Sequence, residues 1–387
     1  MTIIYPVPEI LPDPRARFIQ VMNTCHALAE MGVTVILMAG LKRGSSPESL
    51  FALYGIEPHP RLHFVSVPIL RREHSRHFRI SWHGVFHAAL LARLRRLRSR
   101  STEEPVLFVR HLKLAHFLLR FRTYLGMPLL FEAHEIFHLT ALRARARAKL
   151  KGLEHNVYRG ADGIVTISHS LAEHLRSLGI QESSVRVIHN GIGGEFFRTE
   201  RQEPGSYICY TGSLYFWKGV DTLILAMKHL PSERLVIVGG GGRLKDLISL
   251  ARAEGVGDRV SFVGAVPHAE VPRYLSQAKV AVLPNVPDGP TEFSSPLKLF
   301  EYMASGVPIV ASDVLSFREI LAHMHNALLC SPASPESLAN CITRLVHDPK
   351  LARRLGETAR RDAGNYTYVK RAQRICSFIE QIGHSKP

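Results

Sequence analysis

The sequence of 387 residues predicts two α/β domains, each a doubly wound parallel β-sheet with helices on both faces. Short apolar runs of strand length alternate with amphipathic segments of helix length along most of the chain. Residues 191–206 interrupt this alternation with polar residues and glycines, which is typical of a linker. Hydrophobic residues make up 46% of the chain and charged residues 21%, as in globular proteins, so we expect Rossmann-like domains at 1–190 and 207–365.

In the first domain, the predicted strands are short apolar runs rich in branched side chains. They are expected at residues 3–6, 33–38, 62–67, 106–109, 129–132, 163–167 and 185–188. Between most of them lie segments with apolar positions three and four residues apart, such as 18–30 and 111–124, which predict helices. Strands that alternate with helices favour parallel pairing, because each helix returns the chain to the same edge of the sheet.

The second domain repeats this pattern, and the chain after residue 333 predicts helices only. Strands are expected at 207–210, 235–238, 260–263, 280–283, 308–311 and 327–329, and helices at 219–229, 243–254, 271–277 and 297–303. The last helix, 366–387, is expected to pack back on the first domain. We expect the two domains to face a cleft at the carboxyl ends of their strands, where open α/β sheets bind ligands.

The chain is basic, with 49 lysines and arginines against 33 acidic residues, a net charge of +16. Residues 71–100 hold nine arginines and one acidic residue, and residues 141–151 hold five basic residues and no acidic one. Such a surface attracts an anionic membrane or a nucleic acid, and the alternative is a solvated basic face. Arginines interleave with leucines near Trp82, so we expect a basic helix on an anionic membrane. The arginines of this helix are Arg93, Arg95, Arg96, Arg98 and Arg100.

The location of the protein is predicted from what the sequence lacks. No apolar run approaches the roughly 20 residues that cross a bilayer, and the first residues lack the pattern of a secretory signal. The five cysteines are scattered without a CxxC pair, which excludes a disulfide framework and a zinc ribbon. We therefore expect a cytoplasmic protein, at the inner face of the cell membrane if the basic helix binds it.

Two glycine-containing loops follow predicted strands of the second domain. In the first, Gly212 and Ser213 precede Lys218, so backbone N–H groups and a mobile cation are available to a phosphate. The alternative is a turn with a surface lysine. In the second, Gly239 and Gly240 begin a run of four glycines that lets a ligand approach the backbone, although a tight turn is an equal alternative. The run is not a GxGxxG fingerprint, so a nicotinamide cofactor is not indicated.

The stretch SPLKLFEYMASG at 295–306 gives the strongest pattern. Ser295 is expected as the N-cap, Pro296 as the first helical residue, and Leu297 within a buried stripe. Lys298 in the first turn opposes the helix dipole, which is expected where an anion compensates it. Glu301, three residues later, projects on the same side and suits the hydroxyls of a ribose. The alternative is a surface ion pair between these last two residues.

These stretches resemble the donor-binding domain of glycosyltransferase family 4, retaining enzymes of the GT-B fold, in the subgroup with an SPLK stretch. The matching segments are VTISHSLAEHL at 165–175, VRVIHNGI at 185–192, YTGSLYFWKGVDTLI at 210–224, LVIVGGGG at 235–242, VSFVGAVPHAEVPRYLSQAKVAVLP at 260–284 and SPLKLFEYMASGVPIVAS at 295–312. The first half matches more loosely, through FEAHE at 131–135.

The resemblance implies transfer of a hexose from a nucleotide-diphosphate sugar, UDP- or GDP-linked, to an acceptor hydroxyl with retention and without a metal or other cofactor. It implies that Lys218 contacts the diphosphate and Glu301 the ribose hydroxyls. Lys298 and the amides around Ser295 and Leu297 would complete the phosphate site. His134, in FEAHE, would lie near the donor sugar and the acceptor, and its acidic neighbours Glu132 and Glu135 are expected to favour its charged form.

Two departures from the family pattern leave alternatives open. Ser213 stands where the family usually has an arginine, and Phe293 stands where it usually has a glutamate. An inactive partner subunit is therefore one alternative, and a soluble acceptor in place of a lipid-linked saccharide or polysaccharide of the cell envelope is another. Epimerases and phosphorylases share the fold but are not expected to carry these motifs. A nucleic-acid-binding module would explain the charge but not glycine loops in the less basic half.

Overall fold

The computed structural model describes residues 1–13, 15–69, 82–101, 103–141, 143–287, 292–293 and 295–384, without the side chains of Trp82, His83 and His384. The chain forms two compact units. Unit 1 consists of Met1–His189 and Tyr368–Pro387, and unit 2 of Asn190–Thr367. The segment 191–206, which the sequence predicts as a linker, belongs to unit 2, where Ile192 and Phe196 are buried.

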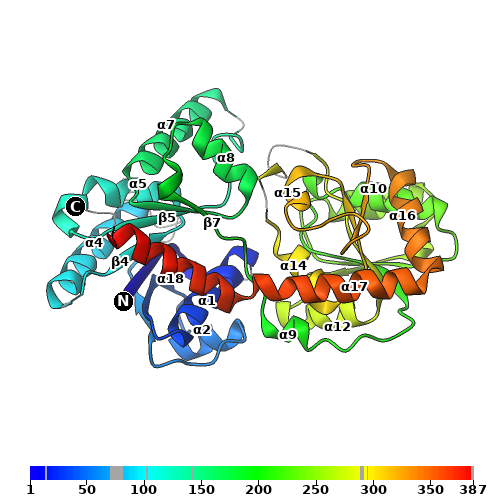
Figure 1. The fold of residues 1–387 in the computed structure, drawn as a ribbon, viewed down its shortest axis with the longest axis horizontal. Coiled ribbons are helices and arrows are strands. Elements are labelled where there is room, and N and C mark those ends of the chain that lie inside the picture. Colours follow the sequence, from blue (N-terminus) through cyan, green and yellow to red (C-terminus); the bar gives the residue numbers. More distant parts are fainter. Residues whose placement is uncertain are drawn as a thin grey trace. The chain divides into compact units, whose positions relative to one another are not determined.

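Unit 1 contains a parallel seven-stranded sheet with the strand order β3-β2-β1-β4-β5-β6-β7 (Figure 1). Its strands are β1 (Thr2–Leu11), β2 (Thr34–Leu41), β3 (Leu62–Ser66), β4 (Val106–Val109), β5 (Leu129–Ala133), β6 (Gly163–Thr166) and β7 (Val185–Val187). Its helices are α1 (Ala16–Glu30), α2 (Pro47–Leu53), α4 (Trp82–Arg100), α5 (Leu112–Arg120), α6 (Arg122–Leu125), α7 (Ala144–Gly160), α8 (His169–Ser177) and α18 (Tyr368–His384), with the 3-10 turn η1 (Glu182–Ser184). All the strand pairs are parallel, as the alternation of strands and helices predicts.

The core of unit 1 joins the two ends of the chain. Helix α18 contributes Ala372, Ile375 and Phe378 to the same buried cluster as residues of α1, β1 and β2. In Figure 1 the red helix α18 runs along the blue helix α1. The last helix is therefore part of the apolar core of unit 1, although residues 190–367 separate it from the rest of that unit.

Unit 2 contains a parallel six-stranded sheet with the strand order β10-β9-β8-β11-β12-β13. Its strands are β8 (Tyr207–Thr211), β9 (Leu235–Val238), β10 (Val260–Gly264), β11 (Ala278–Leu283), β12 (Ile309–Ser312) and β13 (Leu328–Cys330). Its α-helices are α9 (Gly194–Phe197), α10 (Val220–Ala226), α11 (Leu244–Ala253), α12 (Val271–Ser276), α14 (Leu297–Ser305), α15 (Leu315–Arg318), α16 (Pro335–His347) and α17 (Pro349–Ala363). Its 3-10 turns are η2 (Phe216–Lys218), η3 (Met227–His229), η4 (Gly257–Arg259), η5 (His268–Glu270) and η6 (Gly364–Tyr366).

The strand order confirms the predicted fold class, because both sheets have the doubly wound order 3-2-1-4-5-6, which β7 extends by a seventh strand in unit 1. In such a sheet the direction of winding reverses between the first and fourth strands, and ligands bind at the carboxyl ends there. The reversal lies between β1 and β4 in unit 1, and between β8 and β11 in unit 2. These two points are where functional side chains are expected within each unit.

Helix α4 corrects one prediction about the membrane. Phe86, Leu90 and Leu94 on this helix are fully buried, so its apolar face belongs to the core of unit 1 and cannot enter a bilayer. Arg95 and Arg98 donate hydrogen bonds to backbone carbonyl groups of the α6 region, at 3.1 Å each. The remaining arginines predicted for this surface are half-buried (Arg93) or exposed (Arg96 and Arg100). The side chain of Trp82 and the arginine-rich residues 71–81 lie outside the described residues.

Candidate functional site

The first turn of α14 places a buried lysine at the point where the sheet of unit 2 reverses. The helix begins at Leu297, with Pro296 rather than the predicted Ser295 as its N-cap, and within the described residues no side chain caps it. The Leu299 N–H group donates to the Pro296 carbonyl oxygen at 3.1 Å, whereas the N–H groups of the two preceding residues have no partner within the helix and can serve a ligand. Lys298 is 7% exposed, and no acidic residue lies in that turn. The helix dipole at this end disfavours a cation and favours an anion.

The ammonium group of Lys298 has unusual surroundings. Its Nζ atom lies 3.8 Å from the centre of the Tyr210 ring and has no hydrogen-bond partner among the residues that the structure describes. Burial and the positive charge of Lys218 hold the pKa of Lys298 well below its ordinary value, although Glu301 acts in the opposite direction. A buried cation without a hydrogen bond, next to a second cation, is stabilised when an anion binds between them.

The loop after β8 approaches this lysine closely. A Cβ atom at Gly212 would lie 3.5 Å from the Nζ atom of Lys298, and the Tyr210 hydroxyl donates to the Ser213 carbonyl oxygen at 2.8 Å. Lys218 ends the turn η2, and Gly219 follows with a φ of 64°. A Cβ atom there would lie 1.8 Å from the carbonyl oxygen of Pro284, so only glycine fits. The loops after the adjacent strands β8 and β11 therefore pack against each other.

The second glycine run supports the first loop. Gly239 has a φ of 146°, and a Cβ atom on it would lie 1.9 Å from the Gly212 carbonyl oxygen. The carbonyl oxygen of Gly240 accepts a hydrogen bond from the Leu214 N–H group at 3.0 Å. Close packing of the two loops accounts for the glycine at 239, and binding of a ligand by Gly239 or Gly240 stays a prediction.

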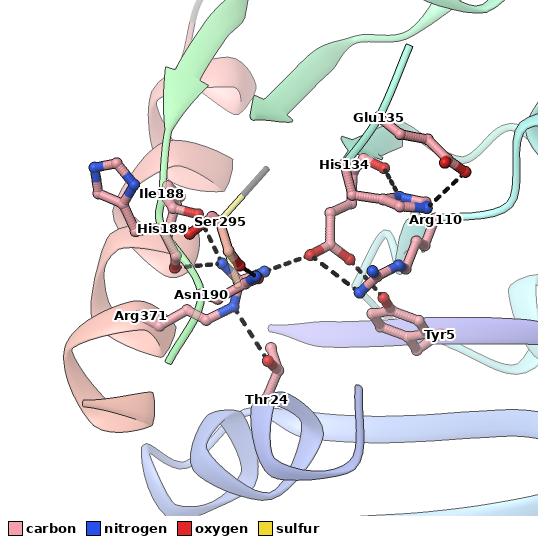
Figure 2. Close-up of polar contacts among 11 residues, drawn as sticks. Tyr5, Thr24, Arg110, His134, Glu135, Ile188, His189, Asn190, Ser295 and Arg371 are labelled. Atoms are coloured by element: carbon pink, nitrogen blue, oxygen red, sulfur yellow. Dashed lines mark hydrogen bonds and ion pairs between the residues drawn. The ribbon is translucent and has the colours of Figure 1, made fainter. Parts of the chain in front are cut away.

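Two polar side chains near these loops, Asn285 and Asn190, were not predicted from the sequence, and the predicted Ser295 lies with them. Asn285, just after β11, is fully buried, and neither polar atom of its amide has a hydrogen-bond partner within the described part of the chain. The same holds for the hydroxyl of Ser295 and the amide oxygen of Asn190. The amide nitrogen of Asn190 donates to the Ser295 carbonyl oxygen (Figure 2). Buried polar groups without partners are rare, so these atoms are available to a polar ligand.

Glu301 is buried one turn after Lys298, which contradicts the alternative of a surface ion pair between them. Its Oε1 atom lies 2.8 Å from the Nε2 atom of His268, a residue in the turn η5. The carboxylate raises the pKa of His268, although burial of the imidazole acts in the opposite direction. This contact could not be predicted from the sequence, because 33 residues separate the two side chains.

Unit 1 contains a buried charged network centred on Glu132 at the end of β5. Its carboxylate accepts hydrogen bonds from Tyr5 at 2.7 Å and from Arg371 at 2.6 Å, and Arg110 lies 4.0 Å away. Figure 2 shows Arg371 of α18 also donating to Thr24 and to the carbonyl oxygens of the two residues 188 and 189. Burial alone would raise the pKa of Glu132, but the two guanidinium groups and the tyrosine lower it overall.

His134 lies at the carboxyl end of β5, where it was predicted, but its charge state differs from the prediction. Its Nε2 atom is 3.6 Å from Glu135. Burial and the positive charge of Arg110 lower the pKa of His134, and they outweigh Glu135 and Glu132. The imidazole is therefore neutral at neutral pH and can accept a proton.

Each unit therefore carries part of the predicted site. Unit 2 brings together Gly212, Lys218, Lys298 and Glu301, with Ser295, Pro296 and Leu297 at the start of α14. Unit 1 holds His134 beside Arg110 and Glu135. Within the described residues, no group of three or more histidines, cysteines, aspartates and glutamates is arranged to hold a metal ion. No helix in that part of the chain has the length and apolar character needed to cross a membrane.

The sequence matches two family models, one in each half of the chain. Residues 194–362 match the model described as glycosyl transferases group 1, and residues 19–194 match the model described as glycosyltransferase family 4. The glycogen synthase of Mycobacterium tuberculosis strain H37Rv is 27% identical over 292 residues, which are 72% of this chain and 68% of that protein. An uncharacterized glycosyltransferase of Methanocaldococcus jannaschii is 32% identical over 205 residues, which are 48% of this chain and 51% of that protein.

Solved structures with the same architecture cover nearly the whole chain. The sucrose-phosphate synthase of Thermosynechococcus elongatus has a TM-score of 0.79 at 20% identity, with all of both chains covered. HepE of Anabaena, solved in complex with UDP-glucose, has a TM-score of 0.74 at 17% identity, with 98% of this chain and 99% of that chain covered. At these identities the likeness concerns the fold, which is the GT-B fold.

Proposed function

Since the chain belongs to the glycosyltransferases of family 4, we propose that it is an active retaining enzyme that moves a hexose from a nucleotide-diphosphate sugar to an acceptor hydroxyl. The donor diphosphate binds at the start of α14, and the acceptor binds to unit 1. HepE, a structural relative, was solved with UDP-glucose, so UDP-linked donors are the first to test and GDP-linked donors the second.

The buried ammonium group of Lys298 carries this proposal. It is 7% exposed, has no hydrogen bond among the described residues, and lies within the field of a second lysine, Lys218. The positive charge of Lys218 makes the burial of the Lys298 ammonium group less favourable, and a diphosphate with two negative charges at Lys298 offsets this. The N–H groups of the first two residues of α14, which have no partner within the helix, and the glycine at 212 add donors and space for the same anion. A surface ion pair between Lys298 and Glu301 would not bury this charge.

The remaining polar groups suit the nucleoside and the leaving group. The Glu301 carboxylate, one turn after Lys298, accepts hydrogen bonds from the paired hydroxyls of a ribose. Asn285 and Ser295 offer buried donors and acceptors that lack partners in the described chain. Lysines at the diphosphate stabilise the negative charge that develops as the bond from the sugar carbon to the phosphate oxygen breaks.

The proposed reaction needs no protein nucleophile and no metal ion. The acceptor oxygen attacks the sugar carbon on the face that the diphosphate leaves, and the leaving phosphate oxygen takes the acceptor proton. His134 of unit 1 is neutral and partly buried, so it accepts a hydrogen bond from a sugar hydroxyl without adding a positive charge. Activity is expected to persist after treatment with EDTA.

Donor hydrolysis and transfer over a panel of UDP-, GDP- and ADP-sugars test this function. The wild-type protein is expected to bind one nucleoside diphosphate and to turn over the matching sugar donor. The variant Lys298→Met is expected to lose both, while the surface variant Lys228→Met retains them. If the protein binds a nucleotide but turns over no donor with any acceptor extract, the alternative of an inactive partner subunit replaces the enzyme.

For the acceptor we propose a saccharide linked to a lipid in an anionic membrane, in cell-envelope or exopolysaccharide synthesis. The leucines of α4 are buried, so the apolar face of that helix is not available to bind a membrane. The first half of α7, in contrast, is basic and exposed on all its faces. Its exposed cations are Arg143, Arg145, Arg147, Lys149 and Lys151. Co-sedimentation with vesicles containing phosphatidylglycerol is expected at low salt and should be lost when three of them become glutamate. Equal binding by that variant, or none by the wild type, leaves the soluble acceptor.

A further inference from the structure

A histidine for which the sequence predicted no role contacts the carboxylate of Glu301. His268 lies in η5, between β10 and α12, and its Nε2 atom is 2.8 Å from Glu301 Oε1. An ionised carboxylate only accepts hydrogen bonds, so Nε2 carries the hydrogen and donates it. The Glu301 side chain is 8% exposed, and the His268 side chain is 29% exposed. The histidine therefore satisfies one oxygen of a carboxylate that is almost completely buried.

Neighbouring groups keep the imidazole in this orientation. Its ring packs against Phe196 of α9, with 5.3 Å between the ring centres. Glu301 of α14 and Glu195 of α9 both raise the pKa of His268, and their effect outweighs the burial of the ring. The ring is thus held from one side by an aromatic contact, and its bond to Glu301 is assisted by charge.

We propose that His268 is a positioning residue, which fixes the Glu301 carboxylate so that its second oxygen meets the ribose of a bound nucleotide. Within the described residues, Glu301 Oε2 has no hydrogen bond of its own. A buried glutamate with one oxygen bound presents the other in a single direction, which lowers the cost of orienting it during binding. This inference rests on the proposed function, because it assigns the ribose to Glu301.

Calorimetric binding of three probes tests the inference. The probes are UDP (or GDP, whichever the wild type binds), the corresponding 2′-deoxyribonucleotide, and inorganic pyrophosphate. His268→Ala is expected to bind the ribonucleotide about tenfold more weakly, because it loses one charge-assisted hydrogen bond, and to bind pyrophosphate unchanged. It should also discriminate less between ribose and deoxyribose. His268→Gln, which restores an N–H donor, is expected to recover most of the affinity.

The controls separate this role from a structural one and from the proposed function itself. His229→Ala removes an exposed histidine of the same unit and should bind all probes like the wild type. His268→Leu, which keeps the volume of the ring, replaces the alanine variant if that variant unfolds. Unchanged ribonucleotide affinity in the folded variant overturns the inference, as does an equal loss for pyrophosphate. Failure of the wild type to bind any nucleotide rejects the proposed function instead.

Discussion

Replacing Lys298 by methionine should stabilise the ligand-free protein and abolish donor binding. Burying an ammonium group without a hydrogen bond costs several kcal/mol, of which the contact with the Tyr210 ring, at 3.8 Å, recovers about 2 kcal/mol. Methionine fills a similar volume and makes its own contact with the ring. The expected net gain is about 1–2 kcal/mol. For a unit of this size that raises the melting temperature by about 2–8 °C.

Differential scanning fluorimetry and calorimetric titration with UDP and GDP measure both effects on the same samples. The matched control is Lys228→Met, because Lys228 is exposed and its ion pair with Glu254 is expected to contribute less than about 1 kcal/mol. A melting temperature of Lys298→Met below that of the wild type, without ligand, would refute the account of an uncompensated buried charge. Nucleotide affinity equal to that of the wild type would refute the diphosphate site.

Four further predictions concern the charged groups and the glycine loop. Arg371→Ala leaves the buried Glu132 without its closest cation, so we expect the free energy of unfolding, measured by chemical denaturation, to fall by about 3–5 kcal/mol. A fall of less than about 1 kcal/mol would contradict a stabilising role for this network. The pKa of Glu132 is lowered from 4.5, so its contribution to stability is present above that pH and is lost as the pH falls through the lower folded-state value. Acid titrations of the wild type should show this loss, and those of Arg371→Ala should show a smaller one, because Arg110 and Tyr5 remain beside the carboxylate. Diphosphate binding should raise the lowered pKa of Lys298, so the protein should take up protons as it binds. Calorimetric titrations in buffers of different ionisation enthalpy measure this uptake, and a release of protons would contradict the prediction. Gly219→Ala places a Cβ atom against Pro284 and should weaken UDP binding at least tenfold while the unit stays folded, and normal binding would exclude a role for this close approach.

The fold was predictable because its information is local. Each buried strand appears as a short apolar run, and the helices between the strands show their apolar spacing, so parallel, doubly wound sheets were predicted from the alternation. The strand order within each sheet comes from the structure. Lys298 was also predictable, because a lysine in the first turn of a short helix violates the dipole rule at a single position. Its neighbour at 301 was predicted on the same side, but not its burial.

Long-range contacts explain the errors. His134 was expected to be charged because its acidic neighbours are visible in the sequence, whereas the opposing Arg110 comes from another strand end. Likewise, no pattern joins His268 to α14, or Arg371 to Glu132 across more than two hundred residues. The leucines of α4 have the same spacing whether they face a core or a membrane, so their spacing does not distinguish the two environments. In the structure Leu90 and Leu94 are buried in the core.

The position of α18 has a consequence for how the protein is made. A ribosome synthesises residues 190–367 before the helix that completes the core of unit 1. The chain of unit 2 is therefore complete before the chain of unit 1. Until α18 emerges, the nascent amino-terminal unit exposes the apolar surface that Ile375 and Phe378 later cover. Over the same time Glu132 lacks the hydrogen bond from the guanidinium group of Arg371. The apolar surface of the half that is translated first therefore stays exposed for the longer time. We expect chaperones that bind apolar surface on ribosome-bound chains to act mainly on that half.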